Sequence, residues 1–345
     1  MVLMRRAALF GLLLIAQPLV WASDGYVLKF ATLAPEGSTW MNLIAEWAER
    51  VEHDSQGQLR FKLYPGGVAG DEPDVLRKIR FGQLQGSAIT GHGIGLIYPP
   101  ARVLEMPFMF QDDAEVDYVR ERLRPEFGDG FFKNGFELVG WIEVGWVRYF
   151  SKAPIRSIDD LRQRRIWLWQ GDPLAEAFFA VSGLAPVPLA ITEVFTSLST
   201  GLLDTVYSPP LAAVAMQWFT KAPYMTTKPM TNGIGALVID KRFFDRLPKS
   251  LQALLRDSGH QTAERMIAET RRDNAKSLDA LKQQGVHFVD WRSDDAGLVL
   301  ELRNKAAYLL AQQRYIPAEL FKRVLGMVDE YRARAAPDAA APPSR

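Results

Sequence analysis

The most constraining feature of this sequence is a long stretch between Pro248 and Gln284 that contains no proline and is rich in Leu, Ala, Arg, Gln and Glu. These residue types favour helix, and a helix of about 35 residues at about 1.5 Å per residue would be about 50 Å long. One small domain cannot bury a helix of that length. Because a chain of 345 residues has the usual length of two domains, the sequence predicts that this helix packs against two lobes.

Shorter strand and helix patterns alternate along the rest of the chain. Residues 26–33 alternate in hydropathy and are rich in β-formers, and residues 59–64 form a second such segment, so both are predicted strands. Ser38 and Asp71 are suitable N-caps for the helices that follow. Alternation of this kind predicts parallel strands with crossover helices, and therefore an α/β sheet. The same alternation of strand and helix patterns predicts further strands at 136–146, 165–169, 186–189 and 233–239. It also predicts further helices at 157–161, 172–182 and 192–200.

The first 22 residues have the pattern of a targeting segment rather than of a folded element. Arg5 and Arg6 precede an apolar run at 7–16, and Val20-Trp-Ala22 fits the small-x-small rule for signal-peptide cleavage. The apolar run is too short to span about 30 Å of hydrocarbon. We therefore expect a signal peptide at 1–22, cleavage after Ala22, and export of the mature protein to the periplasm. Cleavage would leave 39 basic and 40 acidic residues.

Charge and residue usage argue against several classes of function. The 41 basic and 40 acidic residues give a net charge of +1 and form no basic cluster, which argues against nucleic-acid binding. The chain has no cysteine, so disulfides, thiolate metal sites and cysteine nucleophiles are excluded. The four histidines share no metal-ligand spacing, so we expect no metal and no cofactor. Gly-x-Ser-x-Gly is absent and no Ser/His/Asp set occurs in a recognised order, so we do not expect an enzyme.

Several segments, in order along the chain, resemble one known family. They are Leu28-Lys-Phe-Ala-Thr-Leu33, Leu63-Tyr-Pro-Gly-Gly-Val-Ala-Gly70, Leu104-Glu-Met-Pro-Phe-Met-Phe110, and the runs 157–169 and 186–209. Together they resemble the DctP-type substrate-binding proteins of TRAP (tripartite ATP-independent periplasmic) transporters. The resemblance implies a two-lobed α/β periplasmic binding protein fold with crossover strands and a cleft that closes around one small-molecule ligand. It also implies delivery of that ligand to TRAP membrane permease subunits without ATP hydrolysis.

We expect the two lobes of that fold to be discontinuous in sequence. Lobe I would comprise 23–144 plus 233–272, and lobe II would comprise 145–232 plus 273–332. Residues 333–345 are dominated by Ala, Pro, Ser and Arg, which predicts a disordered tail. We expect the mature protein to be a monomer.

The resemblance also identifies a departure at the ligand site. The strand that follows the helix at 157–161 carries, in most members, an arginine that clamps a ligand carboxylate, and the matching residue here is Trp167. A second family arginine aligns with Val147, and a family asparagine aligns with Ser208. Arg148 is next to Val147, but neighbouring strand residues point to opposite faces, so Arg148 replaces that arginine only if the alignment shifts by one residue.

The tryptophan pair leads to a hypothesis about the ligand. Trp167 and Trp169 share a face of a regular strand, and an indole attracts apolar or cationic groups rather than carboxylates. Contact with part of two indoles is worth about 2–3 kcal/mol at roughly 25 cal/mol per Å², similar to the roughly 1.5–3 kcal/mol of a charged hydrogen bond. We therefore expect an apolar or aromatic ligand. The alternatives are that both tryptophans are lobe core, or that Arg148, Arg165 or Lys228 holds a conventional carboxylate or dicarboxylate.

Other residues near the matched positions complete the candidate site. The glycines of Gly91-His-Gly-Ile-Gly95 do not match a dinucleotide-binding loop, and we interpret them as a strand-to-loop junction beside the cleft. Trp40 and Trp47, seven residues apart on one helix face, are predicted core. An alternative of another class is a ligand-presenting protein that docks onto another periplasmic protein. The remaining candidate ligand-binding residues are Thr90, His92, Trp146, Gln170 and Tyr207.

Overall fold

The computed structural model describes residues 25–292 and 295–335. The predicted signal peptide at 1–22 lies outside the described residues. Helix α12 (Ala318–Ala335) includes residues 333–335, so the prediction of a disordered tail is wrong for these three residues. The physical reason is that Ala and Arg are strong helix formers and continue a helix that is already nucleated. The rest of that predicted tail lies outside the described residues.

Within the described residues, eight strands form one mixed sheet and two more form a separate parallel pair, β5–β6. The order of the large sheet is β10-β8-β4-β9-β3-β1-β2, with β7 paired to β4. The strands are β1 (Tyr26–Thr32), β2 (Leu59–Tyr64), β3 (Gly86–Thr90), β4 (Phe136–Ser151), β5 (Trp167–Trp169), β6 (Val187–Leu189), β7 (Thr205–Ser208), β8 (Tyr224–Thr226), β9 (Thr231–Asp240) and β10 (His287–Val289).

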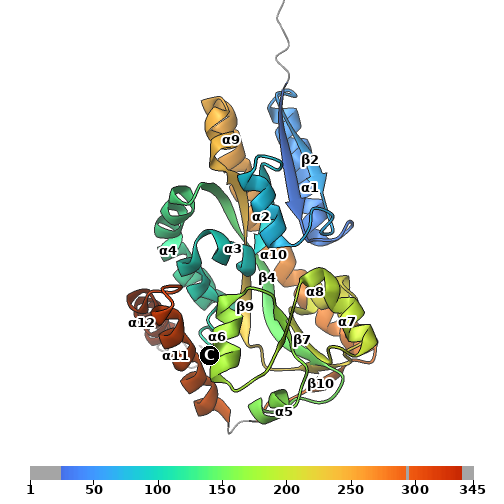
Figure 1. Cartoon of the computed structure of the whole chain (residues 1–345). Coiled ribbons are helices and arrows are strands. Elements are labelled where there is room, and N and C mark those ends of the chain that lie inside the picture. Colours follow the sequence, from blue (N-terminus) through green and yellow to red (C-terminus); the bar gives the residue numbers. More distant parts are fainter. Residues whose placement is uncertain (1–24, 293–294, 336–345) are drawn as a thin grey trace, which may run out of the picture.

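The α/β class is confirmed, but the expectation of parallel strands holds only in part. Strand β1 runs parallel to β2 and to β3, whereas β4 and β9 run antiparallel to each other and to their other neighbours. The long strand β4 pairs with β9 along most of its length and with β7 and β8 at its end, so it passes from one half of the molecule to the other (Figure 1). The alternation rule describes local strand–helix–strand units and does not apply to strands that cross between lobes.

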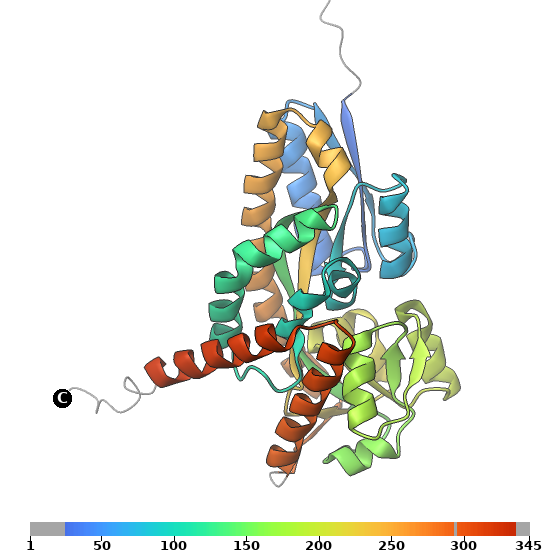
Figure 2. The same cartoon turned by 60° about the vertical axis from the view of Figure 1, so that its left-hand side comes forward.

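The predicted long helix is present as α10 (Lys249–Gln283), which packs on both α1 and α8 and so runs alongside both halves (Figures 1 and 2). Across 25–292 and 295–335, no helix combines the length and apolar character needed to cross a membrane. The other helices are α1 (Thr39–Asp54), α2 (Glu72–Arg80), α3 (Gly91–Ile97), η1 (Pro99–Glu105), α4 (Asp113–Lys133), α5 (Ile158–Arg162), α6 (Pro173–Val181), η2 (Ile191–Glu193), α7 (Val194–Thr200), α8 (Pro210–Ala215), η3 (Trp218–Thr220), α9 (Lys241–Arg246) and α11 (Ala296–Gln312).

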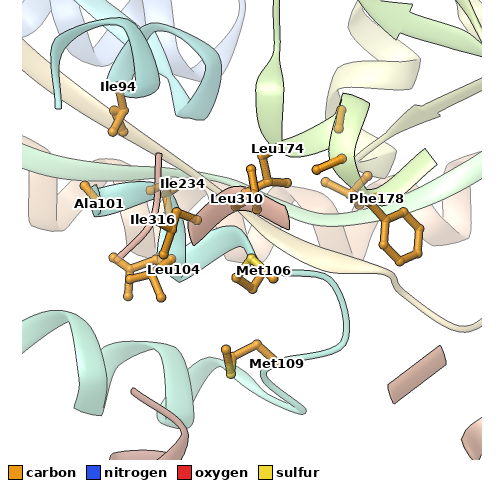
Figure 3. Close-up of a cluster of buried hydrophobic side chains, with 14 of the residues drawn as sticks. Ile94, Ala101, Leu104, Met106, Met109, Leu174, Phe178, Ile234, Leu310 and Ile316 are labelled. Carbon is orange, nitrogen blue, oxygen red and sulfur yellow. The ribbon is translucent and has the colours of Figure 1, made fainter. Parts of the chain in front are cut away.

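Helices α11 and α12, which the sequence patterns did not predict, lie on the outside of the molecule next to α4 and α6 (Figure 2). Helix α11 packs on α6, and α12 packs on α4 and η1. Figure 3 shows Leu174 of α6 beside Leu310 of α11, within a buried cluster that also holds Met106 and Ile234. This cluster anchors α6, which carries part of the cavity described below, against both η1 and the C-terminal helices.

Candidate functional site

A cavity of about 390 Å³ lies where loops and strand ends of the two halves meet. Its wall is mostly apolar and its size falls within the usual range of small-molecule sites. The contributing segments are the loop after β1, the β3–α3 junction, η1, β4, β5, the start of α6, the β7–α8 junction and β9. Elements from distant parts of the sequence therefore enclose one space that can hold one small molecule.

Four aromatic rings form one side of the cavity. The ring centroids of Trp167 and Tyr207 lie 4.9 Å apart and stacked, those of Trp167 and Trp169 lie 5.5 Å apart, and His92 stacks on Trp169 at 4.9 Å. Both indole nitrogens are already engaged: Trp167 Nε1 donates to the Leu189 carbonyl and Trp169 Nε1 donates to Asp71 Oδ2, each at 3.0 Å. The rings are therefore held rigidly and present apolar surface to the cavity.

A buried ion-pair group forms another part of the wall. The Arg102 Nη1 and Nη2 atoms donate to Asp172 Oδ1 and Oδ2, both at 3.0 Å, and Arg102 Nε lies 2.6 Å from Glu105 Oε2. All three side chains are at most 9% exposed. Burial raises the pKa of Glu105, whereas Arg102 holds the pKa of Asp172 below its usual range against the effect of burial.

The wall also contains His92, a buried polar side chain without hydrogen-bond partners among the described residues. It is 3% exposed, and neither ring nitrogen has a hydrogen-bond partner within the described residues. Burial lowers the pKa of His92, although Asp172 opposes that shift. The lowered pKa favours the neutral imidazole, which has one donor and one acceptor nitrogen, and both nitrogens are buried without a partner among the described residues.

The glycines of 91–95 lie on the short helix α3, so the prediction of a loop is wrong. Their function is to let polar side chains approach the helix closely. A Cβ on Gly91 would lie 1.9 Å from Glu105 Oε2, and a Cβ on Gly93 would lie 2.8 Å from Glu72 Oε2. Glu72 accepts hydrogen bonds from the Thr90 nitrogen at 2.7 Å and from the Gly93 nitrogen at 2.5 Å. Burial nevertheless dominates and raises the pKa of Glu72 to about 8.

The raised pKa of Glu72 predicts a pH-dependent stability. The folded state binds a proton more tightly than the unfolded state, so the free energy of unfolding is expected to fall as pH rises from about 5 to about 8. The slope would be up to about 1.4 kcal/mol per pH unit. Urea unfolding at several pH values measures this slope, and Glu72→Gln is expected to flatten it. The exposed Glu52→Gln serves as the control; an equal slope in all three proteins would contradict the prediction.

Most of the predicted ligand residues lie in the cavity wall, but several do not. The wall includes Trp167, Trp169, Tyr207, Ser208, Thr90 and His92. Gln170 and Lys228 are exposed and lie outside it. Trp146 instead donates to Asp113 Oδ1 at 2.7 Å.

The arginines considered as carboxylate ligands also lie outside the wall. Val147 lines the cavity whereas Arg148, its neighbour on β4, does not, as expected for opposite faces of a strand. Burial lowers the pKa of Arg148. Arg165 is largely exposed and lies 3.4 Å from Asp204.

Sequence reasoning missed three important wall residues. Arg102 and Asp172 are 70 residues apart, so no local pattern indicates their pairing. Trp40 was predicted as core with Trp47, but it lines the cavity and donates to Thr270 Oγ1 at 3.0 Å. The spacing of Trp40 and Trp47 identifies a shared helix face: Trp47 is buried in the core, and Trp40 is half-buried, packs against the same cluster and also lines the cavity. In the part of the chain that the structure describes, no group of three or more His, Cys, Asp or Glu side chains is placed to hold a metal ion.

Comparison with known proteins identifies the family of this chain. Residues 30–297 match the family of bacterial extracellular solute-binding proteins, family 7 (DctP). The chain belongs to this family. It is 24% identical over 244 residues to the 2,3-diketo-L-gulonate-binding periplasmic protein YiaO of Escherichia coli, covering 69% of this chain and 73% of the relative. It is 20% identical over 270 residues to the sialic acid-binding periplasmic protein SiaP of Vibrio cholerae, covering 76% and 82%.

Solved structures share the two-lobed fold. The sugar acid binding protein DctPAm of Advenella mimigardefordensis, in complex with galactonate, has a TM-score of 0.83 at 19% identity, covering 89% of this chain and 98% of that protein. A TRAP periplasmic solute binding protein of Pseudomonas putida F1 with bound D-glucuronate has a TM-score of 0.79 at 24% identity, covering 86% and 96%. This DctP-family chain is therefore a TRAP-type solute-binding receptor for a small molecule and not an enzyme. Such receptors work in the periplasm with membrane permease subunits.

Proposed function

We propose that this DctP-family protein captures a small apolar or aromatic ligand in the cavity and delivers it to a TRAP permease, after removal of residues 1–22 and as a monomer. The observation that carries the proposal is the chemistry of the wall. Aromatic rings form one side, and Arg102, which is the only Arg or Lys lining the cavity within the described residues, is already paired with two carboxylates. An apolar ligand needs no further cation.

The candidate residues would make two kinds of contact with the ligand, apolar and polar. Trp167, Trp169 and Tyr207 offer ring faces and edges, and contact with part of two indoles supplies about 2–3 kcal/mol. The unpartnered nitrogens of His92, with the hydroxyl groups of Thr90 and Ser208, would orient one polar atom of the ligand. A mainly apolar pocket with a few placed polar groups is the usual design of a small-molecule site.

Closure would use a hinge where β4 and β9 cross between the proposed lobes. Gly145 pairs with Gly233 next to a register shift in the β4–β9 ladder, and Gly145 has a φ of +111°. A Cβ on Gly145 would lie 2.4 Å from Asn274 Nδ2 on α10. These positions coincide with the proposed lobe boundaries at 144/145, 232/233 and 272/273. A bulged pair of glycines bends a strand at low energy, which supports a hinge motion of one lobe against the other.

A conventional acid ligand is the second candidate, favoured by the galactonate and D-glucuronate bound in the similar structures. In this chain the acid would have to reach Arg148, because Arg165 and Lys228 are exposed and lie outside the cavity wall. Arg148 is the strand partner of the wall residue Ser208, but its own side chain does not line the cavity, so acid binding at that residue requires the side chain to move.

A thermal-shift panel of matched neutral and acidic compounds separates the two candidates. It would include benzamide with benzoate, phenylacetamide with phenylacetate, galactonate and D-glucuronate. Neutral aromatic compounds are expected to raise the melting temperature, since a hundredfold excess over Kd stabilises by about 2.7 kcal/mol. Mass spectrometry of molecules that co-purify with the protein provides a second measurement. Stabilisation by the acids alone would contradict the proposal.

The polar contact is tested by His92→Phe, which keeps a ring against Trp169 and removes both ring nitrogens. The affinity for the best amide of the panel is expected to fall about tenfold, because one hydrogen bond contributes about 1–1.5 kcal/mol. Isothermal titration measures this affinity. The exposed His53→Phe on α1 is the matched control and should bind like the wild type. Equal affinity in both variants would exclude His92 from the site.

A further inference from the structure

The paired state of Arg102 suggests what decides between acidic and neutral ligands. Arg102 and Asp172 both line the cavity, and their side chains are 4% and 7% exposed. The two terminal nitrogens of the guanidinium donate to the two oxygens of Asp172, at 3.0 Å each. This parallel, two-bond arrangement is the one that a guanidinium forms with the carboxylate of a bound acid. Asp172 therefore occupies the position that an acidic ligand would need in order to bind Arg102.

Asp172 is itself held firmly in this position. It is the N-cap of α6, and its Oδ1 accepts from the Leu174 nitrogen at 3.1 Å. Arg102 is fixed from its other side by Glu105, whose Oε1 accepts from the Ile234 nitrogen at 2.8 Å. The pair thus joins η1 to α6 across the cavity wall, and neither member can turn toward a ligand without breaking a contact.

The local charge also opposes an acid. Asp172 and Glu105 face Arg102 directly, and Asp71 lies in the same region, where it accepts from Trp169 Nε1. The Arg102 guanidinium is thus paired with two carboxylates before any ligand binds. A ligand carboxylate would add a further negative charge. It would also have to displace the Asp172 carboxylate, which is part of the chain and cannot diffuse away.

We propose that Asp172 is a specificity-determining residue: it acts as an internal carboxylate that occupies Arg102, so that the cavity accepts uncharged ligands and excludes acids. The proposal rests on the proposed function and deepens it by naming the charge of the ligand. It also predicts that removing the Asp172 carboxylate creates a site for small carboxylates, because the vacated space joins the cavity and leaves the two terminal nitrogens of Arg102 without a carboxylate partner.

Chemical rescue tests this proposal without knowledge of the natural ligand. Asp172→Ala is expected to melt at a lower temperature than the wild type, and about 50 mM formate or acetate should raise its melting temperature by about 3 °C. Formamide and acetamide, the matched neutral compounds, should not do so. Sodium chloride at equal ionic strength controls for salt.

Asp240→Ala is the matched control variant. Asp240 is also a helix N-cap paired with an arginine, since it accepts from the Phe243 nitrogen and from Arg242 on α9, but it lies outside the cavity wall. Formate is expected to leave the wild type and Asp240→Ala unchanged within about 1 °C. If formate stabilises all three proteins equally, or none of them, the proposal is overturned.

A second variant covers the case in which Asp172→Ala does not fold. Asp172→Asn keeps an oxygen for the Leu174 nitrogen and removes the charge. Titration with benzoate and benzamide is expected to show that the ratio of their affinities shifts toward benzoate by about tenfold relative to the wild type; an unchanged ratio overturns the proposal. Failure of neutral compounds to bind the wild type would instead refute the proposed function, and the rescue by formate would be unaffected.

Discussion

Replacing Arg102 with methionine is expected to lower the free energy of unfolding by about 3–5 kcal/mol, the loss usually seen when one partner of a buried ion pair is removed. Asp172 and Glu105 would remain buried with no cation between them. The pKa of Glu105, which burial already raises, would then rise further, and the pKa of Asp172 would rise above its unfolded value. The variant should therefore recover stability as pH falls and lose it as pH rises through neutrality. Urea unfolding of Arg102→Met at pH 5 and at pH 7.5 measures both effects.

Two further variants show whether this loss comes from uncompensated charge. Arg165→Met removes an arginine that is largely exposed beside Asp204, so a loss below about 1 kcal/mol is expected. Combining Arg102→Met with Glu105→Gln and Asp172→Asn removes all three charges and should recover much of the stability of the single variant. If Arg102→Met and Arg165→Met lose equal amounts of stability, the buried pair is not what stabilises this part of the wall.

Replacing Trp169 with alanine is expected to have the second large effect, a loss of about 3–5 kcal/mol together with the loss of ligand binding. The indole stacks on His92 and lies against Trp167, and its nitrogen donates to Asp71 Oδ2. Alanine would remove one side of the cavity and leave a void between β5 and the start of α2. Urea unfolding and the response to the best panel compound in a thermal-shift assay measure the two losses.

Trp169→Phe is the control that separates ring contact from hydrogen bonding. It keeps an aromatic face against His92 and removes only the donor to Asp71, whose Oδ2 still accepts from the Ile191 nitrogen at 3.3 Å. A loss of about 1 kcal/mol is expected, with binding retained. Should Trp169→Ala bind the panel compound as tightly as Trp169→Phe, the aromatic wall would have no role in binding.

Local signals in the sequence located many elements of this fold accurately. The strand predicted at 59–64 is β2, and the helix predicted between Pro248 and Gln284 is α10, which begins at Lys249 and ends at Gln283. Asp71 caps α2, as its place before an amphipathic stretch indicated. These predictions succeeded because N-caps, hydrophobic periodicity and the absence of proline act within a few residues of the chain.

The errors arose where distant segments meet. The glycines at 91–95 suggest a loop by their residue type, whereas they lie on α3, where Gly91 and Gly93 leave room for the Glu105 and Glu72 side chains. Trp40, predicted as core from its spacing to Trp47, packs against that core cluster, but it also lines the cavity, which the spacing does not indicate. Periodicity identifies an apolar face of a helix without indicating whether protein or an open cavity covers that face.

The sequence by itself determined the α/β class and the family resemblance; the replacement of the family's ligand-binding arginine by Trp167 stays a prediction. These properties follow from local patterns and from residues aligned along one chain. Only the tertiary structure decided that Arg102 and Asp172 meet in the cavity wall. The physical reason is that the electrostatics of a buried site depend on which charges the fold brings within a few ångströms of each other, and such pairs leave no signal in sequence spacing.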